Sequence, residues 1–128
     1  MRYSYATNFY PPAPLIDITV TLPPQARITN QISSKALVDT GSDITVIPQN
    51  IIDNLSLMPC GELTAQYSDG MQHKEIAYAA IVVVNGLRTK LLPIIGSTRR
   101  SYALLGRDFI NDVILRLEYR NSFFELTP

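Results

Sequence analysis

The clearest pattern in this sequence is the alternation of apolar and polar residues within short stretches. Residues 15–22 alternate in this way and are rich in β-branched side chains, which predicts a half-buried β-strand. Pro23-Pro24 would end that strand, because proline cannot donate a hydrogen bond to a sheet. Two short apolar runs, residues 36–38 and 44–47, predict strands on either side of a polar segment that begins at Asp39.

Turn signals between the apolar runs predict a series of hairpins. Asp69-Gly70 is a two-residue hairpin signal, and Asn85-Gly86 is a second one. The further strands expected between turns are residues 62–68, 71–84, 87–95, 102–105, 114–119 and 122–127. Short helices are expected over residues 48–55, where Pro48 suits a first turn, and within residues 108–113. Turns that recur about every ten residues indicate a closed or folded-over all-β architecture.

The chain is expected to form one domain preceded by a short arm. Residues 1–14 carry three tyrosines and end in Pro11-Pro12-Ala13-Pro14, which predicts an irregular or extended arm. Residues 30–34 are polar and predict a loop. No internal repeat and no linker divides the remainder, so residues 15–128 are expected to fold as a single domain of ordinary size.

Composition narrows the class of protein. Of the 128 residues, 46% are hydrophobic, and 11 basic residues balance 11 acidic ones. This neutral balance argues against a surface for nucleic acid or for an anionic membrane. No apolar run approaches membrane-spanning length, and the residues after Met1 do not resemble a signal peptide. The single cysteine, Cys60, allows no intrachain disulfide, and with the single histidine, His73, it is too little for a structural zinc site. We therefore expect a cytoplasmic protein.

The segment most informative about function is Asp39-Thr40-Gly41-Ser42, which lies between two of the apolar runs. Such a segment holds a carboxylate at the end of a buried strand, on a tight turn that glycine permits. The tripeptide alone is a weak signal, and an ordinary strand-to-turn connection is the alternative. Residues 103–108 strengthen it, because they form an apolar run followed by Gly106-Arg107 and a helix-like stretch.

Together the two segments resemble the retropepsin family, the single-domain aspartic proteases of retroviruses, retroelements and some cellular proteins. The resemblance covers residues 15–112, with an active-site loop, a glycine-tipped hairpin, and an apolar strand before Gly-Arg and a short helix. It implies a retropepsin-like closed β-barrel and cleavage of peptide or protein substrates without a metal or organic cofactor. The mechanism needs two aspartates and the sequence has one such motif, so a homodimer is implied.

The resemblance assigns roles to the residues of the first segment. Asp39 would be the catalytic aspartate, sharing one proton with its twin while the pair activates a water. Thr40 would bond across the dimer, and Gly41 would present its backbone carbonyl to the substrate. Ser42 would donate a hydrogen bond to the Asp39 carboxylate.

Further residues would support this site or bind the substrate. Asp43 would contact the substrate backbone and pair with Arg107, with a weak surface ion pair as the alternative. The hairpin Ser68-Asp69-Gly70 would be a flap that closes over the substrate. The residues expected to line specificity pockets are Ile44, Val46, Tyr102 and Leu104.

Two alternatives stay open at this stage. A dimeric or peptide-binding module with the same fold, but with weak or no proteolysis, is the competing function. In the arm, Asn8-Phe9-Tyr10-Pro11 resembles the aromatic-proline junctions that retroviral proteases cut. Tyr10-Pro11 is therefore either a self-processing site or part of an arm that packs on the body or stays mobile.

Overall fold

Short strands make up most of the chain. The computed structural model describes residues 1–24, 30–67, 69–84, 87 and 90–128. The strands are β1 (Arg2–Ser4), β2 (Leu15–Thr21), β3 (Gln31–Val38), β4 (Val46–Pro48), β5 (Pro59–Gln66), β6 (Gln72–Val84), β7 (Lys90–Ser97), β8 (Ala103–Leu105), β9 (Ile114–Glu118) and β10 (Phe123–Thr127). The helical segments are α1 (Gln49–Leu55), α2 (Arg107–Ile110) and the 3-10 turn η1 (Tyr119–Asn121).

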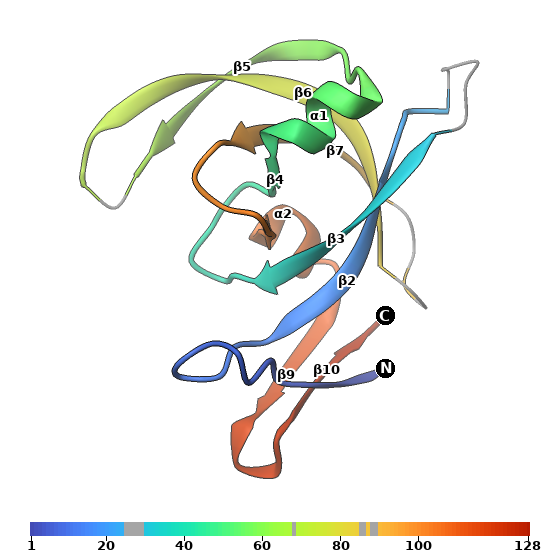
Figure 1. Cartoon of the computed structure of the whole chain (residues 1–128), viewed down its shortest axis with the longest axis vertical. Coiled ribbons are helices and arrows are strands. Elements are labelled where there is room, and N and C mark those ends of the chain that lie inside the picture. The colour runs from blue at the N-terminus through green and yellow to red at the C-terminus, as the bar shows by residue number, and fades with distance from the viewer. Residues whose placement is uncertain (25–29, 68, 85–86, 88–89) are drawn as a thin grey trace.

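Six of these strands close into a ring (Figure 1). The order around the ring is β2-β3-β8-β4-β7-β6, and β6 pairs back onto β2 between Ile18↔Val84 and Thr21↔Ile81. The β3–β8 and β4–β7 pairs are parallel, and the other pairs in the ring are antiparallel. β5 continues the sheet beyond β6, outside the ring. The predicted closed all-β architecture is thus confirmed.

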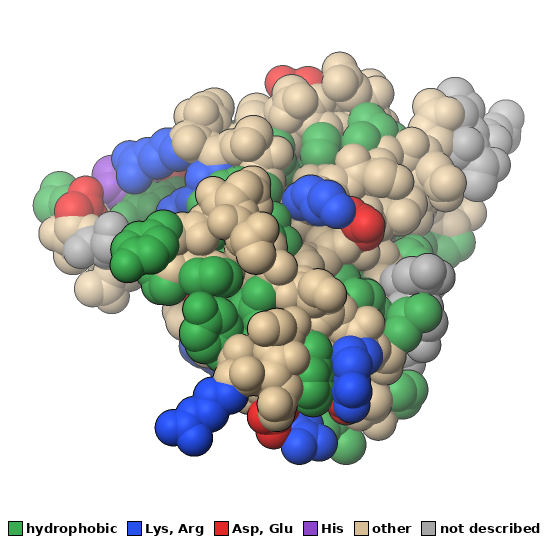
Figure 2. All heavy atoms as spheres, turned by 60° about the horizontal axis from the view of Figure 1, so that its bottom comes forward, with side chains coloured by type: hydrophobic (Ala, Val, Ile, Leu, Met, Phe, Trp, Pro, Cys, Tyr) green, Lys and Arg blue, Asp and Glu red, His purple; other side chains and the backbone are tan. Residues whose placement is uncertain are grey.

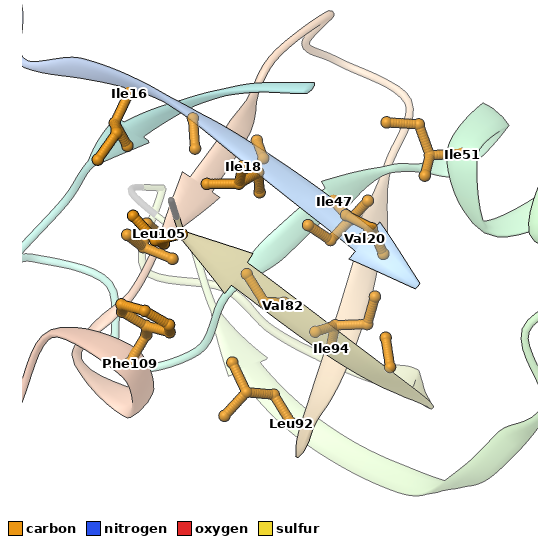
Figure 3. Close-up of a cluster of buried hydrophobic side chains, with 14 of the residues drawn as sticks. Ile16, Ile18, Val20, Ile47, Ile51, Val82, Leu92, Ile94, Leu105 and Phe109 are labelled. Carbon is orange, nitrogen blue, oxygen red and sulfur yellow. The ribbon is translucent and has the colours of Figure 1, made fainter. Parts of the chain in front are cut away.

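Apolar side chains that alternate along the strands fill the inside of the ring. On β2, Ile16, Ile18 and Val20 are at most 2% exposed, whereas Asp17 between them faces solvent. Figure 3 shows the β2 side chains gathered with those of neighbouring strands and with Phe109 of α2. Each fully buried aliphatic side chain stabilises the fold by roughly 1.5–3 kcal/mol. The alternation read from residues 15–22 therefore decides which face of β2 points inward.

The two ends of the chain form a separate three-stranded sheet, in the order β1-β10-β9 (Figure 1). Arg2 of β1 forms an ion pair with Glu125 of β10 at 2.7 Å, and the ring of Tyr3 stacks on that of Phe124 at 5.3 Å. The predicted terminal hairpin is confirmed as β9 and β10. Part of the arm predicted as irregular or extended is a regular strand, because β10 offers it an edge to pair with.

Two segments differ from the sequence-based expectation. Residues 30–34 were expected to be a loop, yet β3 begins at Gln31, because it pairs with β2 from Thr21↔Gln31 onward. The strand expected over residues 44–47 begins only at Val46, because the N–H of Thr45 donates to Asp108 and not to a neighbouring strand. The turn predicted at Asn85-Gly86 lies outside the described residues.

The helices are short and pack on the barrel. α1 follows Pro48, as predicted, and buries Ile51, Ile52 and Leu55. α2 spans four residues and buries Phe109 and Ile110. Within the described part of the chain, no helix is long and apolar enough to span a bilayer.

Candidate active site

The carboxylate of Asp39 lies at the point where the chain leaves β3. The Asp39 N–H donates to the Leu105 carbonyl of β8 at 3.0 Å, which continues the β3–β8 pairing by one residue. The chain then turns, and the N–H of Ser42 donates to the Asp39 carbonyl at 3.2 Å. The N–H of Gly41 donates to Oδ1 of Asp39 at 2.9 Å. The turn therefore holds both the backbone and the carboxylate of Asp39.

The Asp39 loop packs directly on the start of α2. A Cβ atom added to Gly106 would lie 2.6 Å from the backbone carbon of Ile44 and 3.0 Å from the carbonyl oxygen of Ser42. No side chain fits at this distance, so glycine is required by the close approach of two backbone segments. The N–H of Arg107 donates to the Ser42 carbonyl at 2.8 Å and fastens the two segments together.

A buried polar contact between Thr45 and Asp108 locks this packing, and sequence reasoning did not find it. Oγ1 of Thr45, a fully buried residue, donates to Oδ1 of Asp108 at 2.7 Å, and its N–H donates to Oδ2 at 3.0 Å. The same hydroxyl oxygen accepts the N–H of Gly106 at 3.1 Å. The available signal was that Thr45 is the one polar residue in the apolar run 44–47.

The side chain of Arg107 supports the loop by binding the loop's backbone. Nη1 of Arg107 donates to the carbonyl of Thr40 at 2.6 Å. Among the described residues no ion pair joins Arg107 to Asp43, so the predicted pairing of these two side chains is wrong for the single chain. Asp43 is exposed at the edge of the cleft described below.

The predicted hydrogen bond from Ser42 to the Asp39 carboxylate is also wrong. Oγ of Ser42 donates to the carbonyl of Ile44 at 2.6 Å. A hydroxyl has one proton, so it cannot donate to Asp39 at the same time. Ser42 therefore stabilises the conformation of the loop. The hydrogen bond to the Asp39 carboxylate that was predicted for Ser42 comes from the Gly41 N–H.

An open cleft of about 870 Å³ lies beside the Asp39 loop. Residues predicted for the active site that line it are Asp39, Gly41, Ser42, Asp43, Ile44, Val46, Leu104 and Arg107. The fold thus brings most of the predicted site together from two segments, residues 39–46 and 104–107, that are far apart in the sequence.

Four predicted residues lie elsewhere, and one is not described. Thr40 is exposed beside the cleft, and Asp69 and Gly70 lie at the tip of the β5–β6 hairpin. Tyr102, predicted to line a specificity pocket, instead packs edge-on against Phe9 of the arm at 5.5 Å, in a second groove. Tyr102 lies just before β8, which begins at Ala103, so the alternation within the strand does not place its side chain on the side that Leu104 faces. Ser68 lies outside the described residues.

The β5–β6 ribbon reaches over the same side of the barrel as the Asp39 loop (Figure 1). At its tip, the N–H of Gly70 donates to the Tyr67 carbonyl at 2.9 Å, and the N–H of Met71 donates to Oδ1 of Asp69 at 2.9 Å. Gly70 has φ of +81°, a backbone conformation that favours glycine. The hairpin predicted at Asp69-Gly70 is therefore present.

A cluster next to the tip of this hairpin was not predicted as part of the site. The hydroxyl of Tyr67 donates to Oε1 of Glu75 at 2.6 Å, and this hydrogen bond raises the pKa of Tyr67 above its ordinary value of 10.0. The Tyr67 ring contacts the ring of His73 edge-on at 5.1 Å, and the guanidinium of Arg99 lies 5.4 Å from its centroid. All four side chains line the cleft, together with Arg100. Strand alternation alone would have placed His73 and Glu75 on one face.

The comparison with protein families identifies the chain. Residues 25–112 match the family described as gag-polyprotein putative aspartyl protease. This chain belongs to that family. No curated protein sequence matches the chain significantly.

Solved structures of retropepsin-like proteases share the fold. The protease of simian foamy virus (mac) is 18% identical, with a TM-score of 0.53 over 76% of this chain and 91% of that one. A retropepsin-like aspartic protease from Rickettsia conorii is 18% identical, with a TM-score of 0.53 over 88% of this chain and 90% of that one. The foamy viral protease-reverse transcriptase is 19% identical, with a TM-score of 0.54 over 84% of this chain and 14% of that one. The retropepsin-like barrel is therefore the fold of this chain.

Proposed function

We propose that the protein is an aspartic endopeptidase that is active as a homodimer. The observation that carries the proposal is the Asp39 carboxylate, held at the edge of an open cleft by the Gly41 N–H and by a loop fastened to α2. Each chain supplies one such motif, so two chains are needed to assemble a pair of aspartates.

In the assembled pair, the two carboxylates would hold one proton between them, because like charges about 3 Å apart cannot both ionise. The charged Asp39 would take a proton from a water, whose oxygen attacks the peptide carbonyl carbon. The protonated Asp39 of the other chain would donate its proton to the carbonyl oxygen. Collapse of this intermediate breaks the C–N bond: the leaving nitrogen takes up the proton that the water gave, and one hydroxyl of the intermediate returns its proton to the aspartate pair as the new C=O forms.

The roles of the other loop residues follow in this proposal. The Gly41 carbonyl and Asp43 would contact the backbone of an extended substrate, with Ile44, Val46 and Leu104 as apolar walls of the cleft. The Asp69-Gly70 hairpin would act as the flap. The Thr40 side chain would bond to the partner's loop, with its own backbone already fixed by Arg107.

The test is cleavage of a denatured protein at mildly acidic pH, with and without pepstatin. We expect wild-type protein to cleave it and Asp39→Asn to lose cleavage by at least about a thousandfold while remaining folded. Asp17→Asn is the matched control, since Asp17 is exposed on β2 and does not line the cleft. Full activity in Asp39→Asn would refute the assignment, and peptide binding without cleavage by wild type would favour a binding module of the same fold.

A further inference from the structure

The cleft also contains two arginines that belong neither to the Asp39 loop nor to α2. Arg99 and Arg100 lie in the connection between β7 and β8, and both line the cleft. His73 lines the same cleft, and basic side chains lie next to the histidine in Figure 2. Within the part of the chain that the structure describes, neither arginine has a carboxylate partner.

The acidic side chains of the cleft do not neutralise these two arginines. Among the described side chains, Asp39 and Asp43 of the Asp39 loop form no ion pair with either arginine, and Glu75 accepts the Tyr67 hydroxyl. The third arginine of the cleft, Arg107, differs from them because its guanidinium binds the Thr40 carbonyl. Arg99 and Arg100 are thus the guanidinium groups left to interact with whatever fills the cleft.

Arg99 is also held in place across the cleft. Its guanidinium lies over the Tyr67 ring of the β5–β6 ribbon. The backbone N–H of Arg99 donates to Oγ of Ser97 at 3.1 Å. The cation–π contact leaves the edge of a guanidinium free to bind a carboxylate. A cation fixed in this way loses less side-chain entropy when it binds an acidic group than a fully mobile one does.

We propose that Arg99 and Arg100 form a subsite for an acidic side chain, so that the protein prefers peptides with Glu or Asp at a position flanking the scissile bond. The proposal rests on the proposed endopeptidase function. A homodimer would carry the subsite twice, related by its two-fold axis. The acidic preference is therefore expected at matching positions on both sides of the scissile bond.

The test compares peptides that differ only by Glu, Gln or Lys at each of about four positions on either side of a bond that the wild type cuts. At about pH 6 the glutamate is ionised. At the preferred position we expect kcat/KM to be about fivefold higher for Glu than for Lys, with the ratio falling as salt is added. Arg100→Glu should invert the ratio and Arg99→Gln should reduce it.

Lys74→Glu is the matched control for Arg100→Glu. It makes the same change in charge on the β5–β6 ribbon, and Lys74 does not line the cleft. The Glu to Lys ratio should stay at its wild-type value in this variant. A ratio of one at every position, with the Gln peptide still cleaved, would overturn the acidic subsite and leave the endopeptidase function standing.

A binding measurement keeps the two proposals separate. If the wild type cleaves no peptide, the endopeptidase function fails, and fluorescence anisotropy of labelled peptides with the Asp39→Asn protein decides on the subsite. Tighter binding of the Glu peptide than of the Lys peptide, lost in the Asp39→Asn/Arg100→Glu double variant, supports the subsite. Equal binding of the two peptides overturns it.

Discussion

Thr45 shows how one buried hydroxyl can hold an active-site loop. The residue is fully buried, and its oxygen both donates to the Asp108 carboxylate and accepts from the Gly106 N–H. The contact joins the segment after Asp39 to the first turn of α2, 63 residues further along the chain. Asp39 itself has no bond to Thr45, so this contact acts on the position of the loop.

We expect Thr45→Val to lower the free energy of unfolding by about 3 kcal/mol, because it leaves a carboxylate oxygen and a buried N–H without their partner. Valine has nearly the same shape, so the change isolates the hydroxyl. Urea denaturation measures the effect, and Thr45→Ser, which keeps the hydroxyl, should recover most of the loss. A valine variant as stable as wild type would show that the contact contributes nothing.

At the scale of elements, two structures extend beyond the ring: the tip of the β5–β6 ribbon and the terminal sheet that contains β1. The β5–β6 ribbon is fastened near its tip by the Tyr67–Glu75 hydrogen bond. The N-terminal strand β1 is fastened to β10 by backbone pairing and by Arg2, whose guanidinium binds Glu125 and lies 3.8 Å from the Phe123 ring centroid. In both cases side chains beside the backbone hydrogen bonds hold an element in place.

Stability should depend on pH through Glu125. The hydrogen bond from Arg2 is the largest cause that lowers the pKa of Glu125 below its ordinary value of 4.5. A lowered folded-state pKa gives stability that is present above the unfolded value and is lost as pH falls through the folded value. Arg2→Gln should therefore melt below wild type at about pH 7, with the difference shrinking toward about pH 3.

Thermal melts across this pH range provide the measurement, with two controls. Arg2→Lys keeps the positive charge, so its melting temperature should retain most of the pH dependence seen in the wild type. In a Glu125→Gln background, Arg2→Gln should show only a pH-independent difference, which reports the loss of its contact with Phe123. The same pH dependence with and without Glu125 would contradict the role of this pair.

At the scale of the whole molecule, the closed barrel places the Asp39 loop, which we propose is one half of a symmetric site, on its surface. The Asp39 loop lies at one edge of the ring, and the exposed Thr40 of this loop is next to the cleft. The Arg107 guanidinium holds the Thr40 carbonyl, so the Thr40 side chain starts from a fixed backbone. This arrangement suits a contact with a second copy of the same loop.

We expect Thr40→Ala to weaken the proposed dimer by about thirtyfold in Kd, since it removes a cross-subunit hydrogen bond worth roughly 1 kcal/mol on each of two sides. Analytical ultracentrifugation measures the constant, and activity should rise faster than linearly with enzyme concentration in both proteins. Thr40→Ser keeps the hydroxyl and should behave as wild type. An unchanged dimer constant in the alanine variant would count against this role of Thr40.

Much of the fold could be predicted because it depends on residues that are close together in the sequence. The alternation in β2, the Asp69-Gly70 turn and the terminal hairpin each depend on residues close together in the chain. The position of Asp39 after a buried strand and before a tight turn is equally local. Such features follow from side-chain period and turn chemistry, which need no partner from elsewhere.

Other features depended on segments that meet only in the folded chain. Gln31 joins a strand because β2 lies beside it, and Arg2 joins a strand because β10 does. Arg107 donates to the Thr40 carbonyl, 67 residues away along the chain, because the folded chain brings the two together. A hydrogen bond forms with the nearest correctly oriented group, and sequence spacing does not say which group that is.

The sequence by itself determined the family and the position of the Asp39-Thr40-Gly41 loop, and its single motif of this kind is the reason that the proposed mechanism calls for a second chain. Only the tertiary structure decided that Thr45 and Asp108 brace that loop, and that Arg99 and Arg100 share its cleft. The physical reason is that closing six strands into a ring brings together segments that are far apart along the chain. Which of these segments will touch cannot be deduced from their spacing in the sequence.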